Sequence, residues 1–283
     1  MPGPRRYAAI GLALALSAEP ALAHGSLAER LAELDRGLAA DPRSATLWIE
    51  RASLLRAEGR SGEALADLAR AERAGADRAT LDRERGLALL AGRRPDEAEA
   101  ALTRWLARTP DDAVARAARA SAQEALGRHR EAAGEYARAL ADAPQSPAAP
   151  EWWVGRARSL TATTPPDFDA AIRTLDDAAA RLGPAPAFEQ TALALEIRAG
   201  RTDAALARLA RMANATPRPE GFLVQRAELL ESAGRRDEAA AAYGAALAAL
   251  EDLPPGRRAT PAAASLAARA REAIARLARG ENR

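Results

Sequence analysis

The chain has 283 residues, a formal net charge of +2, 48% hydrophobic residues and 28% charged residues. It has no cysteine, which excludes disulfides, thiolate nucleophiles and cysteine-ligated metals, and no lysine, so all 41 basic residues are arginine. With only two histidines, and with 39 acidic residues balancing the arginines, the composition argues against histidine-based catalysis and against a basic nucleic-acid-binding surface.

Residues 1–23 have the pattern of a secretory signal peptide. Two arginines are followed by an apolar run of about a dozen residues, and small side chains stand at Ala21 and Ala23. Because a membrane span needs about 20 apolar residues, we favour a cleaved signal over a membrane-anchoring N-terminus. We therefore expect cleavage between Ala23 and His24, a periplasmic or secreted location, and no membrane span in the mature chain.

The mature chain is expected to begin with a helical half repeat at residues 27–42. Its apolar residues Leu27, Leu31, Leu34 and Leu38 recur at helical spacing, and the pattern stops at an Asp-Pro pair.

From residue 45 to 253 the chain repeats itself. A short phrase recurs as EGRSGEA, AGRRPDEA, LGRHREA, AGRTDAA and AGRRDEA. In each phrase we expect the glycine to end one helix in the left-handed conformation and an acidic residue to begin the next helix. The closing alanines, together with Ala171 in a divergent copy, lie 34, 34, 39, 34 and 34 residues apart, at Ala64, Ala98, Ala132, Ala171, Ala205 and Ala239. A large residue follows each alanine four positions later, at Leu68, Leu102, Tyr136, Leu175, Leu209 and Tyr243.

A period of 34 residues with helix, turn and helix resembles the tetratricopeptide repeat. Trp48 matches the family's early tryptophan, and Leu193 departs from its small first-helix position, which is otherwise filled by Ala52, Gly86, Ala120, Ala157 and Ala227. The resemblance implies an all-α, right-handed α-solenoid of about six repeats within residues 24–260. The copies are expected near residues 45–78, 79–112, 113–146, 150–184, 186–219 and 220–253.

The 39-residue interval contains five extra residues, which we place in two connections. About three lie in the proline-rich residues 144–150 and about two in residues 163–167. Segment 144–150 is either a hinge or a lengthened connection, and we favour the second because loops tolerate insertion. In the following helix Trp152 and Trp153 are adjacent, so one is expected in the core while the other could be exposed.

Residues 261–283 are expected to form a C-terminal capping helix and tail. Leu266, Ala270, Ile274 and Leu277 share one helical face. A solenoid needs such a cap because its last repeat would otherwise expose an apolar face.

The resemblance also implies a binding surface, because the first helix of each tetratricopeptide repeat lines the concave face. Transferred position by position, the candidate groove residues are Ile49, Arg56, Arg83, Leu87, Ser121, Glu124, Val154, Arg158, Arg198 and Glu228. Val114 and Ile197 occupy further positions of this kind. We expect a protein or peptide partner there, with arginines binding carboxylates.

Other chemistries find little support in the sequence. No phosphate-binding loop, nucleophile elbow or metalloprotease motif occurs, and the paired aspartates are explained by helix capping, so we expect no enzyme, no catalytic residue, no cofactor and no metal. The alternative is an accessory protein of a periplasmic metal or redox pathway, which would use the amino-terminal His24 with His129 as its one further histidine. A third hypothesis is self-assembly through the ends of the array.

Overall fold

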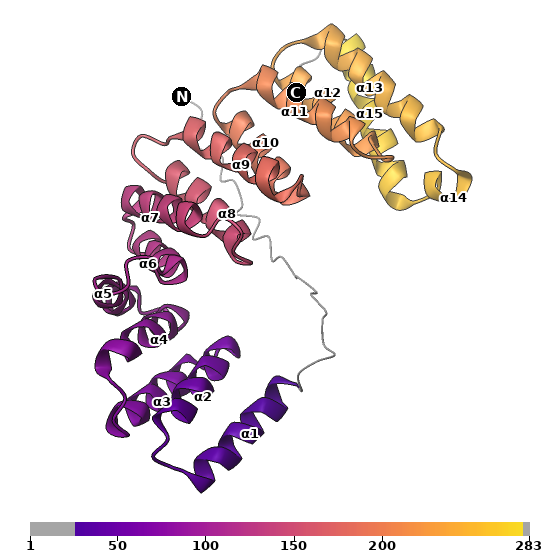
Figure 1. Ribbon diagram of the computed structural model, residues 1–283. Coiled ribbons are helices and arrows are strands. Elements are labelled where there is room, and N and C mark those ends of the chain that lie inside the picture. The colour runs from indigo at the N-terminus through magenta and orange to yellow at the C-terminus, as the bar shows by residue number, and fades with distance from the viewer. Residues whose placement is uncertain (1–25, 280–283) are drawn as a thin grey trace. The chain divides into compact units, whose positions relative to one another are not determined.

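The computed structural model describes residues 26–279 and is entirely helical in that range, with fifteen helices and no strand (Figure 1). The all-α repeat fold predicted from the sequence is confirmed. The first helices of the six pairs are α2 (Ala45–Ala57), α4 (Arg78–Ala91), α6 (Ala113–Ala125), α8 (Ala149–Thr161), α10 (Pro186–Arg198) and α12 (Glu220–Ser232). The second helices are α3 (Ser61–Arg73), α5 (Pro95–Leu106), α7 (His129–Asp142), α9 (Phe168–Leu182), α11 (Thr202–Asn214) and α13 (Arg236–Glu251).

Three helices lie outside these pairs. They are α1 (Leu27–Ala40), the short α14 (Pro255–Arg258) and α15 (Pro261–Ala278). A capping box starts α1, because the Ser26 hydroxyl accepts from the Glu29 amide while the Glu29 carboxylate accepts from the Ser26 amide. None of the helices in residues 26–279 is both long and apolar enough to cross a membrane.

The helices form two compact units, divided between Gly92 and Arg93. The N-terminal unit holds α1 to α4 and the C-terminal unit holds α5 to α15. Within each unit successive helices pack on one another, and apolar residues from neighbouring helices merge into shared cores. This is the packing expected of a repeat array, in which one helix pair cannot bury its apolar face alone.

The six alanines at the repeat's second-helix position are completely buried. Each has a relative exposure of 0%, from Ala64 to Ala239. The large residues four positions later are also buried, with exposures between 0% and 4%. These burials confirm the repeat register, since an alanine with no exposed surface leaves room only for a closely approaching helix.

One close approach explains a glycine inside a helix. Gly155 of α8 lies beneath Tyr136 of α7, where a Cβ atom would stand 2.6 Å from the Tyr136 Cζ atom. An aromatic ring cannot yield by that amount, so α7 and α8 approach this closely only because residue 155 has no side chain.

The connection between α7 and α8 carries no sign of a hinge. Both helices contribute to one continuous core, which includes Tyr136 and Leu140 from α7. This shared core favours a lengthened connection over a hinge at residues 144–150.

Both tryptophans of α8 are buried, with 6% exposure for Trp152 and 5% for Trp153. The expectation that one of them could be exposed is therefore wrong. The reason is that α7 and α9 both pack on α8, so adjacent side chains meet protein on two sides.

The left-handed backbone conformation occurs at a fixed distance before the buried alanine, and this position does not always coincide with the glycine of the phrase. Four glycines five positions before that alanine have positive φ angles, namely Gly59, Gly127, Gly200 and Gly234. In the second repeat the phrase is one residue longer, so the same position falls on Arg93, whose φ is 57°, while Gly92 keeps a φ of −79°. The expected left-handed glycine at Gly92 is therefore wrong by one residue.

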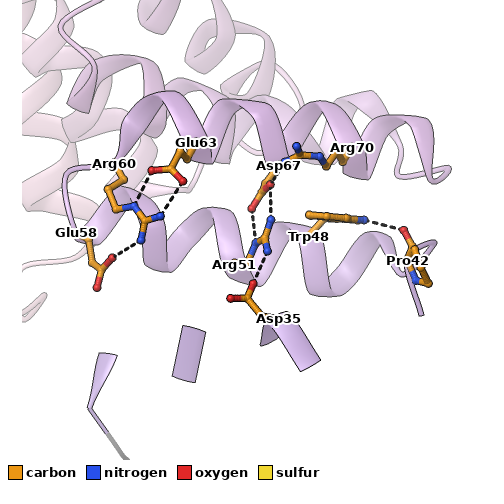
Figure 2. A network of polar contacts seen from close by, with 9 residues as sticks. All are labelled: Asp35, Pro42, Trp48, Arg51, Glu58, Arg60, Glu63, Asp67 and Arg70. Carbon is orange, nitrogen blue, oxygen red and sulfur yellow. Dashed lines mark hydrogen bonds and ion pairs between the residues drawn. The ribbon is translucent and has the colours of Figure 1, made fainter. Parts of the chain in front are cut away.

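A buried charge lies three residues after the alanine in three of the repeats. Asp67 of α3 is 1% exposed and accepts hydrogen bonds from Arg51 at 2.7 and 2.9 Å and from Arg70 at 2.6 Å (Figure 2). Arg51 also pairs with Asp35 of α1, and both arginines lie over the Trp48 ring, at 4.6 and 5.1 Å from its centroid. A carboxylate at this depth is stable only because its oxygens are satisfied.

The equivalent residues of the third and fifth repeats are Glu135 and Arg208. Glu135 is 7% exposed and accepts from Arg119 at 2.6 Å and Arg138 at 3.0 Å. Arg208 is 2% exposed and donates to three acids, which are Glu196, Glu189 and Asp176. Burial acts to lower the pKa of Arg208, but its carboxylate partners raise it above the ordinary arginine value. The sequence analysis had not singled out this repeat position.

Candidate partner-binding surface

The candidate groove residues of the N-terminal unit are Ile49 and Arg56 on α2, and Arg83 and Leu87 on α4. All four are half-buried. Glu84 forms ion pairs with both arginines. Arg83 donates to one of its oxygens at 2.6 Å, and the Arg56 Nη2 atom lies 3.9 Å from the other oxygen. These two arginines are therefore already balanced by a carboxylate of the chain itself.

In the C-terminal unit Glu124 of α6 and Arg158 of α8 form an ion pair across neighbouring first helices. The Arg158 Nη2 atom donates to Glu124 at 2.7 Å, and its Nε atom donates to the second oxygen. This hydrogen bond raises the pKa of Arg158. The two residues are 34 apart in sequence, which is one repeat, and Ser121 and Val154 lie half-buried on the same two helices.

The same arrangement recurs at the end of the array, with the capping helix as the arginine donor. The Tyr136 hydroxyl lies 3.5 Å from Glu124, and the Tyr243 hydroxyl donates to Glu231 at 2.9 Å. Arg276 of α15 donates to Glu231 at 2.7 Å, as Arg158 does to Glu124. A second arginine of α15, Arg269, pairs with the candidate groove residue Glu228 on α12. Helix α15 thus supplies to the last repeat the ion pairs that a further first helix would supply.

Arg198, at the end of α10, differs from the other three groove arginines. It is exposed, and its guanidinium lies 5.3 Å from the centroid of the Phe168 ring, with no carboxylate partner among the described residues. The preceding residue, Ile197, is 47% exposed, and Val114 at the start of α6 is 40% exposed. Within residues 26–279, Val114 and Ile197 are therefore the exposed large aliphatic residues of the predicted surface, and Arg198 is its arginine without an ion pair.

The aspartates considered as catalytic pairs have structural roles. Asp112 caps α6 by accepting from the Ala115 amide at 2.9 Å and also accepts from the Trp105 indole, while Asp167 caps α9. His129 is half-buried at the start of α7. In residues 26–279 no three acidic or histidine side chains gather as a metal site would require. The predicted cleavage site at Ala23 and His24 lies outside the described residues.

The family model described as tetratricopeptide repeat matches three overlapping segments, residues 49–113, 83–150 and 117–186. Together these segments cover nearly half of the chain and include helices α3 to α9 completely. With the fold described above, they identify residues 49–186 as tetratricopeptide repeats.

Solved structures with the same fold extend the likeness to most of the chain. The type IV pilus biogenesis factor PilW has a TM-score of 0.56 and 21% identity, over 66% of this chain and 84% of PilW. A tetratricopeptide repeat protein from Parabacteroides merdae has a TM-score of 0.51 and 14% identity, over 87% and 92% of the two chains. The Naa15/Naa10 complex bound to HypK-THB provides a third match, with a TM-score of 0.52 and 17% identity, over 89% of this chain and 37% of that one. No curated protein sequence matches the chain.

Proposed function

We propose that this protein is an exported, non-enzymatic scaffold that binds a protein or peptide partner on the first helices of its C-terminal unit. The observation that carries the proposal is the exposure of Ile197 beside Arg198, which has no carboxylate partner among the described residues. An exposed aliphatic side chain next to an available guanidinium suits a peptide that presents an apolar and an acidic side chain.

The contacts also indicate which arginines should not contribute to binding. Arg83 and Arg158 already donate to Glu84 and Glu124 at 2.6 and 2.7 Å. A partner carboxylate would have to displace those acids, so the gain in binding free energy would be small. We therefore place the principal contact at Ile197 and Arg198.

The experiment compares a double variant of the mature chain with a single-substitution control. A chain carrying Ile197→Asp and Arg198→Glu is tested beside a control carrying Ala207→Asp, which changes an exposed residue of α11. Partners are captured from an envelope extract with the unmodified chain, the captured protein is purified, and its Kd for all three chains is measured. We expect at least tenfold weaker binding for the first variant and unchanged binding for the control. Equal affinities for all three chains would refute the proposal.

Assembly of an envelope complex is the role that we propose for such a scaffold. It is supported by the signal-peptide pattern of residues 1–23 and by the likeness to PilW, which is itself a type IV pilus biogenesis factor. If the captured partner belongs to no multiprotein envelope complex, the assembly role fails while the binding site stands.

Export is tested separately by the N-terminus of the chain purified from its native cell. We expect residues 1–23 to be absent and His24 to be the first residue, in the periplasmic or secreted fraction. A chain that keeps Met1 and stays in the cytoplasm would contradict export. Copper retained by the correctly processed chain would instead support the alternative based on His24.

A further inference from the structure

Two of the turns between first and second helices form an ion pair with the preceding repeat. Arg201, in the turn of the fifth repeat, pairs with Asp169 of the fourth, and Arg235, in the sixth, pairs with Asp203 of the fifth at 2.6 Å. Each arginine stands four residues before its buried alanine, and each aspartate stands two residues before the alanine of the preceding repeat. The two pairs therefore follow one repeat rule.

Between the third and fourth repeats the same two positions carry reversed charges. The aspartate position holds Arg130 and the arginine position holds Asp167. The expected pair is nevertheless not formed. Asp167 instead caps α9 by accepting from the Ala170 amide at 2.9 Å, and Arg130 is exposed and makes no ion pair with any residue in the described range 26–279.

The longer turn of the fourth repeat explains why Arg130 and Asp167 do not form an ion pair. Residues 162–167 replace the short glycine turn of the other repeats, and the Thr163 hydroxyl fixes this loop by donating to the carbonyls of Leu160 and Pro165, each at 2.8 Å. The inserted residues lie in the turn whose counterpart in the fifth and sixth repeats carries the pairing arginine.

A pocket of about 560 Å³ occupies this place, with Arg130 and Asp167 among its lining residues. Its apolar wall comes from Leu160, Pro165 and Phe168, and Arg201 and Asp169 in the same lining neutralise each other as an ion pair. Its volume lies within the range of small ligand sites, about 300–1,000 Å³. The pocket adjoins the first-helix surface around Ile197 and Arg198, because Phe168 lines the pocket and also lies 5.3 Å from the Arg198 guanidinium, but its own cation Arg130 belongs to the second helix α7.

We propose that this turn pocket is a second binding site, which takes an acidic segment of a protein partner with an aromatic side chain next to a carboxylate. The carboxylate pairs with Arg130, which is the lining cation that forms no ion pair within residues 26–279. The aromatic side chain packs on the wall formed by Leu160, Pro165 and Phe168. A guanidinium with no internal partner keeps its full capacity for a bidentate carboxylate, and the neighbouring apolar wall excludes water from that contact.

The experiment titrates two matched peptides into the mature chain, acetyl-Gly-Phe-Glu-Gly-amide and its neutral counterpart with Gln in place of Glu. The amide resonances of Thr163 and Phe168 report binding, because both residues line the pocket. We expect the acidic peptide to shift these resonances and to bind at least tenfold more tightly than the neutral one. Equal binding of both peptides, or shifts confined to other helices, would overturn the proposal.

Two variants separate the site from general charge attraction. Arg130→Gln should weaken the acidic peptide at least tenfold, while Arg211→Gln, which changes an exposed arginine of α11 outside the pocket, should leave its Kd unchanged. Equal losses in both variants would mean unspecific attraction and would overturn the proposal.

A charge-swapped chain with Arg130→Asp and Asp167→Arg gives an independent test at constant net charge. The swapped chain has an aspartate and an arginine at the same two positions as the ion pairs of the fifth and sixth repeats. It therefore has no unpaired arginine at residue 130. We expect the swapped chain to bind the acidic peptide as weakly as Arg130→Gln does. Unchanged binding would show that the net charge of the chain, and not the guanidinium at residue 130, attracts the peptide.

Discussion

Asp67 in the first repeat and Arg208 in the fifth occupy the same repeat position with opposite charges. Both are almost inaccessible to water, with exposures of 1% and 2%. Asp67 is surrounded by arginines, whereas Arg208 is surrounded by acids. The fold therefore requires a charge at this depth to be hydrogen-bonded but does not require a particular sign of charge.

The partners differ in how much water they reach, and this difference makes the two networks unequal. The side chains of Arg51 and Arg70 are 20% and 45% exposed, so they can be solvated without Asp67. Glu196, the most buried of the three acidic partners of Arg208, is only 5% exposed in its side chain. Removing the charge of Arg208 should therefore lower the free energy of unfolding more than removing the charge of Asp67.

The largest effect is expected for Arg208→Ala. Glu196 would remain buried without its cation, and loss of one partner from a buried ion pair costs about 3–5 kcal/mol. The free energy of unfolding, measured by urea denaturation, should fall by that amount. Arg211→Ala, on the exposed side of the same helix, should change it by less than about 0.5 kcal/mol. Similar small losses for both variants would show that the Arg208 network does not stabilise the array.

A smaller loss is expected for Asp67→Ala. Arg51 keeps Asp35, and both arginines reach solvent, so the cost should be about 1–3 kcal/mol, as for an interrupted hydrogen-bond network. Asp67→Asn, which keeps the shape of the side chain, should lie between the unmodified chain and Asp67→Ala in the same urea experiment. If Asp67→Ala costs as much as Arg208→Ala, the argument from solvent access is wrong.

The left-handed turn position allows the same comparison between repeats, because Arg93 stands where four other repeats have glycine. A side chain in this conformation is strained, so Arg93→Gly should raise the free energy of unfolding by about 1 kcal/mol. The converse change, Gly127→Ala, meets no neighbouring atom and tests backbone strain alone, with an expected loss of about 1 kcal/mol. Thermal unfolding of both variants measures these effects, and a destabilising Arg93→Gly would contradict the explanation.

The smallest effect at neutral pH is expected for Tyr136→Phe, at the position four residues after the alanine. Burial, followed by the negative charge of Glu124, raises the pKa of Tyr136 to about 12, above the ordinary tyrosine value of about 10. The stabilisation by the neutral phenol is therefore complete below about pH 10 and is lost as the pH rises towards 12. Tyr136→Phe should change the free energy of unfolding at pH 7 by less than about 1 kcal/mol. Between pH 10 and 12 the variant should lose less stability than the unmodified chain. If the free energy of unfolding falls equally between pH 10 and 12 in both chains, ionisation of Tyr136 is not the cause of the fall.

The sequence by itself determined the helical repeat and its register. A period of 34 residues, with a small residue at fixed places in both helices, specifies which face of each helix is buried, because helical periodicity is a local property of the chain. It also assigned Ile197, Arg198 and Val114 to the first-helix surface, although it gave Arg83 and Arg158 the same role. It failed by one residue at Arg93, where an additional residue moved the left-handed position past the glycine.

The tertiary structure alone decided which charges meet and which remain free. With 41 arginines and 39 acids, many pairings are compatible with one helical register, and the long side chains select among them only when neighbouring helices are packed. Thus Arg158 binds Glu124 from the preceding repeat, Arg208 binds Asp176 from a helix 32 residues away, and Arg130 is left open by a longer turn. The burial of both Trp152 and Trp153 has the same origin, because a helix covered on two sides has no solvent face for either ring.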